Sequence, residues 1–260
     1  MNYIFFLPIS SILSAPICLF YHYTMPVFIL QNMVKLKADK IYEVTKMNTE
    51  IFLIRHGETI WNTKKLIQGQ LDSPLTDNGI HQSNLLAQRI KKIDPDVIYT
   101  SDLKRAVDTA NIINQHIGKD IVEISGVRER HWGIFQGADW PKIKKFFPTQ
   151  YKYYRNDSKN YMIPNGESYN HVTKRTMDSL IDIIENHKNQ KVVVVTHGGV
   201  ISPLIRDLLS IPYETHKKFI ISNTSITKLV YNEFGFSILS LGDIAHLEGE
   251  KKVLNEMEAG

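Results

Sequence analysis

Cysteine is nearly absent from this chain of 260 residues. Its one cysteine, Cys18, lies in the N-terminal segment. Disulfides, cysteine-bound metals and a thiol nucleophile are therefore excluded from the rest of the protein. The charge is also close to balance, at a formal net +4, and no Lys/Arg block of the kind that binds nucleic acid occurs. We therefore expect no nucleic-acid partner. The length allows one sizeable core rather than two full domains.

Charged residues are missing from residues 1–34, within which residues 4–20 are largely apolar. This run falls a little short of the roughly 20 residues that span a bilayer, and no basic region precedes it as in a secretory signal. Three interpretations stay open: an upstream extension ahead of a true start at Met47, a membrane anchor, and a cleaved signal. We treat residues 1–46 as an N-terminal extension of a domain that covers residues 47–260. The expected location is cytoplasmic, with a membrane anchor at residues 4–20 as the alternative.

Closely spaced histidines are missing as well. The chain has ten histidines, but they are dispersed, and no His-x-His or His-Glu-x-x-His spacing occurs. This distribution disfavours a two-metal hydrolytic site, which needs several ligands held close together. We expect neither a metal nor a cofactor.

From Thr49 onward, patterns typical of strands and helices alternate along the chain. Three β-branched runs, at residues 51–54, 96–99 and 191–195, each end in a polar, basic turn. In open α/β sheets, ligands collect at the carboxyl ends of the strands, so the three turns predict one anion-binding pocket. The side chains that these turns deliver are Arg55, His56, Arg105 and His197.

Further patterns complete an α/β fold class. Helices are expected at about residues 76–92, 102–117, 170–187 and 197–209, and strands at about 121–124, 225–231 and 236–241. Alternation with buried β-branched strands predicts a mostly parallel sheet covered by helices on both faces. Between residues 137 and 166 the pattern lapses into an aromatic, basic insertion, which we interpret as a lid over the sheet edge.

Several motifs carry a resemblance to a known family, in an order that spans most of residues 51–246. They are LIRHGET (53–59), WN (61–62), QG (68–69), LTDNG (75–79), SDLKRA (101–106), RER (128–130), NGES (165–168) and THGG (196–199). On these motifs the chain resembles the histidine phosphatase superfamily, also called the phosphoglycerate-mutase-like clan. The resemblance implies a three-layer α/β/α sandwich and a phosphohistidine intermediate.

The resemblance implies that His56 is the nucleophile. An imidazole attacks only when neutral, so a hydrogen bond must hold one ring nitrogen while the other attacks phosphorus. Arg55 and Arg105 would clamp the phosphoryl oxygens, because a guanidinium stays charged and donates a planar pair of hydrogen bonds. By resemblance, His197 is a third phosphate donor, protonated in the loaded site. Gly57 would let the backbone approach the phosphate.

Four further positions match phosphate or substrate contacts of the family. They are Asn62 and the backbone at Gln68, Gly69 and Gly198. Asn62 also has a second interpretation, as a residue that begins a helix. We keep both interpretations of Asn62 open.

Glu129 matches the proton donor of the family. Its carboxylate would protonate the leaving alkoxide and then take a proton from the attacking water. The neighbouring Arg128 and Arg130 would stabilise the ionised carboxylate if they faced it, so their orientation matters. Glu58 and Glu167 are other carboxylates near the motifs, and we interpret them as structural partners in ion pairs.

The family divides into mutases, which return the phosphoryl group to a substrate, and phosphatases, which pass it to water. The chain has no Arg-Arg dipeptide such as a mutase carries, and Trp140 occupies the place of a mutase lysine. Gln136 pulls the other way, because phosphatases usually carry Glu there. We expect a metal-independent phosphomonoester hydrolase acting through a phosphohistidine, with a cofactor-dependent phosphoglycerate mutase as the alternative. A catalytically silent scaffold is a further alternative, disfavoured because no candidate catalytic residue is missing.

The insertion at residues 137–166 holds six basic residues against two acidic ones, with aromatic residues among them. One interpretation is a lid that favours multiply anionic substrates such as sugar bisphosphates. An equal alternative is an amphipathic helix with a solvated basic face. The expected partner is a small phosphorylated metabolite, and a homodimer is left open.

Overall fold

The computed structural model describes residues 48–215 and 219–248. All of them belong to one unit of the chain, Val44–Gly260. The predictions about residues 1–46, which concern an anchor, a signal and a start at Met47, lie outside the described residues. Among the described residues, no helix is long and apolar enough to cross a membrane.

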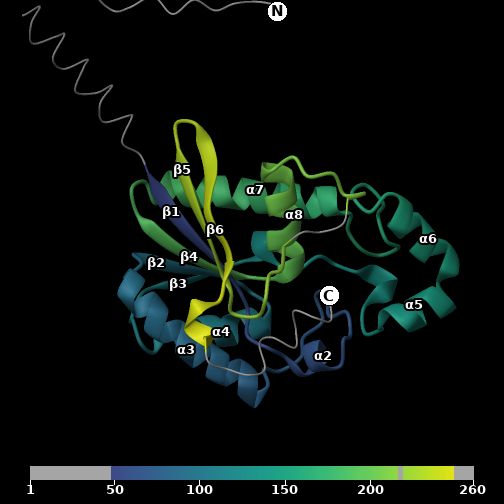
Figure 1. The fold of residues 1–260 in the computed structure, drawn as a ribbon, viewed down its shortest axis with the longest axis horizontal. Coiled ribbons are helices and arrows are strands. Elements are labelled where there is room, and N and C mark those ends of the chain that lie inside the picture. Colours follow the sequence, from purple (N-terminus) through teal and green to yellow (C-terminus); the bar gives the residue numbers. More distant parts are fainter. Residues whose placement is uncertain (1–47, 216–218, 249–260) are drawn as a thin grey trace, which may run out of the picture. The chain divides into compact units, whose positions relative to one another are not determined.

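Within these residues the chain forms a six-stranded sheet in the order β3-β2-β4-β1-β5-β6 (Figure 1). The strands are β1 (Thr49–Arg55), β2 (Val97–Ser101), β3 (Ile121–Ile124), β4 (Lys191–Thr196), β5 (Ile226–Asn232) and β6 (Gly235–Asp243). The neighbours from β3 to β1 pair in parallel, whereas β5 and β6 add two antiparallel pairings. The prediction of a mostly parallel sheet is confirmed.

The central strands β1 and β4 are buried on both faces. Phe52, Ile54 and Val193 pack into one hydrophobic cluster, while Leu53 and Val192 pack into another on the opposite face. Continuous apolar strands of this kind form where helices cover both faces of a parallel sheet.

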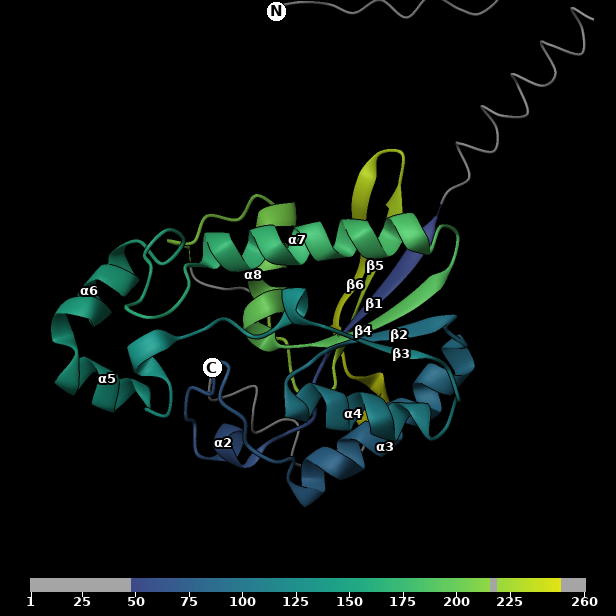
Figure 2. The same ribbon diagram turned by 180° about the vertical axis from the view of Figure 1, so that it is seen from behind.

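Helices form a layer on each face of the sheet (Figure 2). The helices α3 (Asp77–Ile93) and α4 (Lys104–Asn114) pack together on one face, and α7 (Tyr169–Asn186) and α8 (Gly198–Leu208) on the other. This arrangement is the predicted three-layer α/β/α sandwich. Polar caps define two of the helix starts, since Thr76 accepts a hydrogen bond from the backbone of Gly79, and Ser168 accepts one from that of His171.

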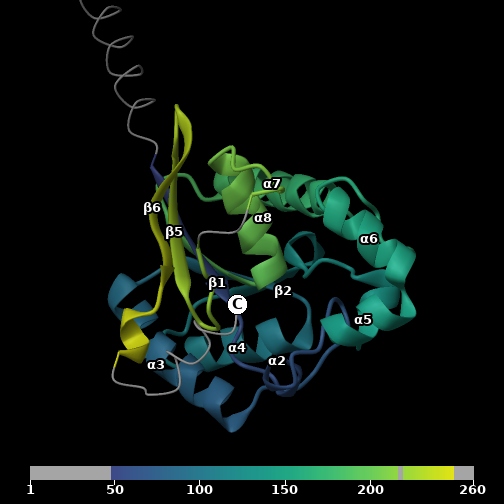
Figure 3. The ribbon, with the colours of Figure 1, turned by 45° about the vertical axis from the view of Figure 1, so that its right-hand side comes forward.

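The predicted insertion is helical and holds α5 (Trp140–Phe146) and α6 (Pro148–Asn156). Both helices lie to one side of the sandwich, beyond the carboxyl ends of β1 and β4 (Figure 3). A proline stands at the start of each helix, where its missing N–H costs nothing. The insertion and the turn before it share a small core, which consists of Trp132, Phe135, Ile143, Tyr154 and Ile163.

Candidate active site

The three predicted turns meet at one edge of the sheet. Arg55 at the end of β1 is paired with Thr196 at the end of β4, and Thr100 of β2 is paired with Val195. The backbone N–H of His56 continues the ladder by donating to the carbonyl of Thr196 over 3.0 Å. Parallel pairing therefore places residues from distant parts of the chain side by side, as the sequence predicts.

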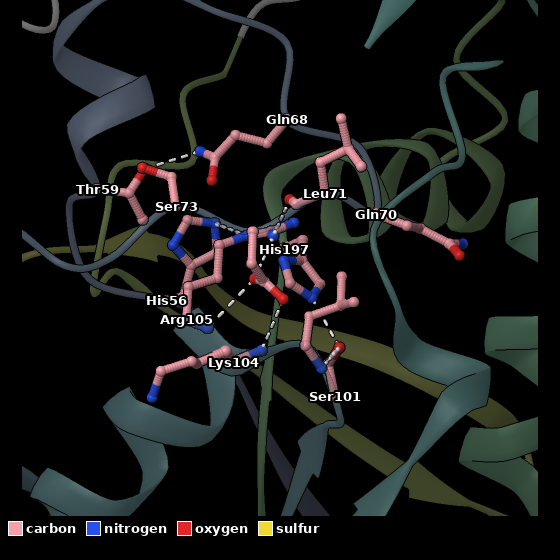
Figure 4. A network of polar contacts seen from close by, with 12 residues as sticks. His56, Thr59, Gln68, Gln70, Leu71, Ser73, Ser101, Lys104, Arg105 and His197 are labelled. Carbon is pink, nitrogen blue, oxygen red and sulfur yellow. Dashed lines mark hydrogen bonds and ion pairs between the residues drawn. The ribbon is translucent and has the colours of Figure 1, made fainter. Parts of the chain in front are cut away.

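His56 is buried, and its hydrogen bonds hold it in one tautomer. Figure 4 shows it beside Arg105 and His197. Its Nδ1 lies 2.8 Å from the carbonyl oxygen of Gly57, which can only accept, so Nδ1 carries the hydrogen. Its Nε2 accepts from Nε of Arg105 over 3.3 Å and therefore keeps a lone pair. Burial and the positive charges of Arg105 and Arg55 hold the pKa of His56 well below its usual range. The imidazole is thus neutral, as nucleophilic attack requires.

Arg105 is almost fully buried, and the segment 69–72 holds its guanidinium. Nη1 donates to the carbonyl of Leu71 and to Oδ1 of Asp72, both over 2.9 Å, and Nη2 donates to the carbonyl of Gly69 over 2.7 Å. The ion pair with Asp72 and these carbonyls compensate the desolvation of the cation. Arg105 is therefore a fixed positive charge beside His56, which also lines the cavity.

His197 is fully buried next to His56, with ring centroids 5.2 Å apart. Its Nε2 shares a hydrogen bond of 2.8 Å with the hydroxyl of Ser101 at the end of β2. Its Nδ1 is buried without a hydrogen-bond partner among the described residues. Burial and the charge of Arg105 lower the pKa of His197 well below its usual range. Its expected protonation concerns the phosphate-bound site and stays a prediction.

Asn62 begins a helix, as one of its two interpretations expects, and its contact with substrate stays a prediction. It lines the cavity, and its side chain completes a capping box with Thr59 at the start of α2 (Ile60–Thr63). Its Oδ1 also lies 3.4 Å from Nδ2 of Asn223, which donates to the carbonyl of His56 over 2.9 Å. The cap therefore fixes the position of Asn62 relative to His56.

Gln68 and Gly69 belong to the segment that surrounds Arg105. The amide nitrogen of Gln68 donates to the hydroxyl of Thr59 over 2.8 Å, and its buried Oε1 has no partner among the described residues. Gly69 has a φ of +58°, and a Cβ there would lie 2.1 Å from Oε1 of Gln136. Glycine at this position therefore allows the chain to turn and to aim its carbonyl at Arg105.

Glu129 lines the same cavity as the two arginines. Its Oε1 accepts from the backbone N–H of Arg130 over 2.7 Å, and its Oε2 accepts from that of Gly199 over 3.0 Å. Gly199 lies in the first turn of α8, where free N–H groups and the helix dipole favour negative charge. Gly198, which begins α8, lines the cavity beside Arg55.

These residues surround a cavity of about 770 Å³. Eight of the nine predicted site residues line it: Arg55, His56, Asn62, Gln68, Gly69, Arg105, Glu129 and Gly198. The ninth, His197, lies next to His56. Aromatic side chains form much of the outer wall. They are Trp132, Trp140, Tyr154, Tyr169 and Tyr213. Among the described residues, no group of three or more His, Cys, Asp or Glu side chains is placed to hold a metal ion.

Comparison with known proteins identifies the family. The family description "histidine phosphatase superfamily (branch 1)" matches residues 51–244. The chain belongs to this superfamily. It is 36% identical over 202 residues to the metal-independent phosphoserine phosphatase of Arabidopsis thaliana, with 76% of this chain and 83% of that protein covered. It is 37% identical over 203 residues to phosphoglycerate mutase-like protein 4 of the same plant, with 76% and 87% covered.

Solved structures of phosphoserine phosphatase from Entamoeba histolytica share the fold. The complex with 3-phosphoglyceric acid superposes with a TM-score of 0.69 at 32% identity, covering 76% of this chain and 99% of that one. A mutant of the same enzyme in complex with phosphoserine gives a TM-score of 0.67 at the same identity and coverage. The α/β/α sandwich is therefore the phosphoglycerate-mutase-like fold.

The two arginines beside Glu129 face away from its carboxylate in this histidine phosphatase. Arg128 forms an ion pair with Asp102. Arg130 is fully buried, donates through Nε to the carbonyl of Glu167 over 2.9 Å, and lies 4.0 Å from the ring centroid of Tyr169. Neither guanidinium pairs with Glu129.

The other two carboxylates singled out in the sequence have structural partners. Glu167 pairs with Nε of Arg175 over 2.9 Å and accepts from the backbone of His131 over 2.8 Å. Glu58 accepts from the hydroxyl of Thr76 over 2.6 Å. Neither lines the cavity.

The structure gives a packing reason for glycine at position 57. Gly57 does not line the cavity, and a Cβ there would lie 2.7 Å from the carbonyl oxygen of Gly79 in α3. The glycine is therefore needed for close packing against the first turn of α3, and the approach of its backbone to phosphate stays a prediction.

Sequence reasoning missed two residues that hold the site together. Asp72 pairs with Arg105, and Asn223 bonds to the carbonyl of His56. Asp72 follows the QG motif closely, so its proximity offered a weak signal. Asn223 lies far along the chain just before β5, where no motif marked it.

Proposed function

We propose that this histidine phosphatase hydrolyses a small phosphomonoester through a phosphohistidine formed at Nε2 of His56. The observation that carries the proposal is the state of this imidazole. It is neutral, its Nδ1–H donates to the carbonyl of Gly57, and its Nε2 lone pair lies beside two arginines at the cavity. A nucleophile held in the correct tautomer next to fixed positive charge suits attack on a phosphoryl group.

In the first step, Nε2 of His56 forms a bond to phosphorus as the bond from phosphorus to the ester oxygen breaks. Arg55 and Arg105 stabilise the charge spread over the equatorial oxygens. Glu129 in its protonated form gives its proton to the leaving oxygen, which departs as an alcohol. The backbone N–H of Gly198 and the start of α8 add positive potential on the same side.

In the second step, a water molecule attacks the phosphorus of the phosphohistidine. Glu129, now ionised, takes a proton from this water while the bond from phosphorus to Nε2 breaks. Inorganic phosphate leaves, and His56 and Glu129 return to their starting states. His197, which bonds to Ser101 and lies next to His56, is the third phosphate donor in this scheme.

Two features support a hydrolase over the mutase alternative. Trp140, at the place of a mutase lysine, lines the cavity and stacks on Tyr154 with ring centroids 5.5 Å apart and planes 11° from parallel. Gln136, which looked mutase-like, has a structural partner, because its Oε1 accepts from the backbone of Gln70 over 2.9 Å. Trp140 offers no cation at the position where a mutase lysine would retain a phosphorylated product. The similarity to a phosphoglycerate mutase-like protein keeps the mutase as the second candidate.

The comparisons favour a carboxylated substrate over the sugar bisphosphate suggested by the basic insertion. One relative is named as a phosphoserine phosphatase, and related structures hold phosphoserine or 3-phosphoglyceric acid. A cytoplasmic location, a homodimer and the absence of a nucleic-acid partner stay predictions, as does the membrane alternative through residues 4–20.

The test is hydrolysis of 4-nitrophenyl phosphate by the full chain in excess chelator, beside His56→Ala. We expect activity to survive chelation and to fall on the order of 10³-fold or more in His56→Ala, because the covalent route is lost. His116→Ala is the matched control, since His116 lies after α4 and does not line the cavity. Equal activity of His56→Ala and wild type would refute the phosphohistidine. Phosphoryl transfer between phosphoglycerates without net hydrolysis would favour the mutase.

A further inference from the structure

The outer part of the cavity carries two charges that the proposed reaction does not use. Arg155 lies in the last turn of α6, and Glu214 lies in the segment that follows α8. Both side chains line the cavity and both residues are exposed. Neither forms a hydrogen bond or an ion pair with another residue in the described part of the chain. Two opposite charges that have no partner within the described ranges are available to a ligand at this cavity.

The segment that carries Glu214 is held in place from beneath. Arg206 of α8 is buried and donates through Nη1 to the carbonyl of Pro212 over 2.6 Å and through Nη2 to that of Thr215 over 3.0 Å. Its guanidinium also lies 5.4 Å from the ring centroid of Tyr213. The backbone is thus fixed on both sides of Glu214, which places this carboxylate at the cavity wall. The two hydrogen bonds of Arg206 to carbonyls hold the backbone, and Glu214 has no ion-pair partner among residues 48–215 and 219–248.

The wall that carries Arg155 is fixed as well. The preceding Tyr154 is buried, and its ring centroid lies 5.4 Å from the guanidinium of Arg130. Lys159, just after α6, forms an ion pair of 3.7 Å with Asp207 of α8. The segment after α8 runs toward α6 in both views (Figures 1 and 2). The two walls are therefore joined, and Arg155 and Glu214 belong to one cavity.

We propose that Arg155 and Glu214 form an outer subsite for the zwitterionic end of a phosphorylated amino acid. This inference rests on the proposed function, because it names the substrate class of the same cavity. A guanidinium pairs with a carboxylate through two parallel hydrogen bonds, and a carboxylate accepts from an ammonium group. A carboxylated substrate without an ammonium group would bring its negative charge toward Glu214 with no compensating contact. The subsite therefore selects O-phosphoserine over 3-phosphoglycerate.

Four substrates distinguish the contribution of Arg155 from that of Glu214. O-phosphoserine carries a carboxylate and an ammonium group, 3-phosphoglycerate only the carboxylate, O-phosphoethanolamine only the ammonium group, and glycerol 3-phosphate neither. We would measure kcat/KM of the full chain on each of them. Wild type should prefer O-phosphoserine to the other three, because only this substrate satisfies both residues.

Charge-removing variants then assign each preference to its residue. Glu214→Gln should lower kcat/KM roughly fivefold on the two ammonium substrates and leave or raise it on the other two. Arg155→Gln should lower kcat/KM roughly fivefold on the two carboxylate substrates and leave glycerol 3-phosphate unchanged. Lys152→Gln and Glu233→Gln are the matched controls, since both residues are exposed and neither lines the cavity.

Two results would overturn the inference. One is a Glu214→Gln effect that is equal on all four substrates, and the other is an Arg155→Gln effect that does not follow the carboxylate. Calorimetric binding of the four compounds to His56→Ala distinguishes this failure from failure of the proposed function. If binding to His56→Ala depends on Glu214 and Arg155, but the wild type hydrolyses neither these compounds nor an aryl phosphate, the hydrolase is refuted and the subsite stands. Hydrolysis without charge-dependent selection would refute the subsite alone.

Discussion

Two neutral imidazoles and a buried cation occupy the centre of the site. Burial and Arg105 both lower the pKa of His56 and of His197. Asp72 and backbone carbonyls in turn hold Arg105. The positive charge therefore stays on the guanidinium, while His56 keeps the lone pair that attack requires. A substrate phosphate would enter a cavity whose cations are already fixed, so little reorganisation is needed in the transition state.

The role of Glu129 can be tested through the leaving group. Glu129→Gln should lower kcat/KM for alkyl phosphates on the order of 10²-fold or more, because an alkoxide needs a proton to leave. On 4-nitrophenyl phosphate the kcat/KM of the same variant should fall only about tenfold, since nitrophenolate leaves without a proton in the first step. Steady-state kinetics on both substrates makes the comparison.

Glu58→Gln is the matched control for this prediction, because Glu58 bonds to Thr76 and does not line the cavity. Equal losses of Glu129→Gln on both substrates would show that the carboxylate positions other groups and is not the proton donor.

At the scale of single residues, the sequence predicted which side chains gather at the sheet edge, because the strand ends carried them. It did not predict which way the flanking arginines of Glu129 point. That direction depends on partners far along the chain. Arg128 forms an ion pair with Asp102, and the guanidinium of Arg130 lies over the ring of Tyr169. Contacts of this kind depend on packing and leave no local pattern.

Among the elements, α8 contributes most directly to the site. It begins immediately after His197, and its first two residues are glycines. The backbone N–H of Gly199 donates to Glu129, which places the proposed proton donor at the positive end of the helix. Because its first two residues have no side chains, the helix comes close enough to Glu129 to position the carboxylate.

Gly199→Ala tests this close approach. A Cβ at this position would lie 2.0 Å from Oε1 of Glu129, so the carboxylate must move. We expect roughly a tenfold or greater loss on alkyl phosphates and a smaller loss on 4-nitrophenyl phosphate, in line with disturbed proton transfer. Kinetics on the same substrate pair reads out the effect.

Gly198→Ala is the neighbouring control. Its Cβ would come no closer than 3.4 Å to the atoms around it, the nearest being Nε of Arg55. Any loss of kcat/KM in this variant should be similar on both substrates, because the added methyl group would lie near Arg55 and not near Glu129. A leaving-group effect as large as that of Gly199→Ala would contradict the assignment.

The elements themselves were largely predictable. The helix after Thr76 and the helix after Ser168 have side-chain caps that the sequence shows plainly. The helix expected from residue 102 begins only at Lys104, since the backbone of Leu103 is still extended. The insertion forms two short helices where the sequence allowed one amphipathic helix, because Pro148 starts a second helix.

At the scale of the whole molecule, the last described residues are linked by hydrogen bonds to the segment next to the nucleophile. His246, in η4 (Ala245–Leu247), lies with Nε2 3.2 Å from the hydroxyl of Thr224. The backbone N–H of Thr224 donates to the carbonyl of Arg55 over 2.9 Å. An ion pair between Arg89 of α3 and Asp243 of β6 fixes the same region. The C-terminal strands are therefore connected to the residues next to the nucleophile.

This connection predicts a pH-dependent contribution to stability. Burial and the charge of Arg89 lower the pKa of His246 to about 4, although Asp243 acts in the opposite direction. In the unfolded chain a histidine has its ordinary pKa of about 6.5, so between these values the unfolded state binds a proton that the folded state does not. The contribution of His246 to the free energy of unfolding is therefore fully present above pH 6.5 and declines as the pH falls toward 4.

His246→Gln should remove this dependence. Urea unfolding of both chains from about pH 5 to about pH 7.5 should show a wild-type slope that is steeper below pH 6.5 by up to about 1.4 kcal/mol per pH unit. Partial exposure of the ring reduces this figure, so about 1 kcal/mol per pH unit is expected. Above pH 7 the two slopes should coincide, because both states of the wild type then hold a neutral imidazole. Parallel slopes over the whole range would show that His246 titrates alike in both states, and the C-terminal connection would then add nothing that depends on pH.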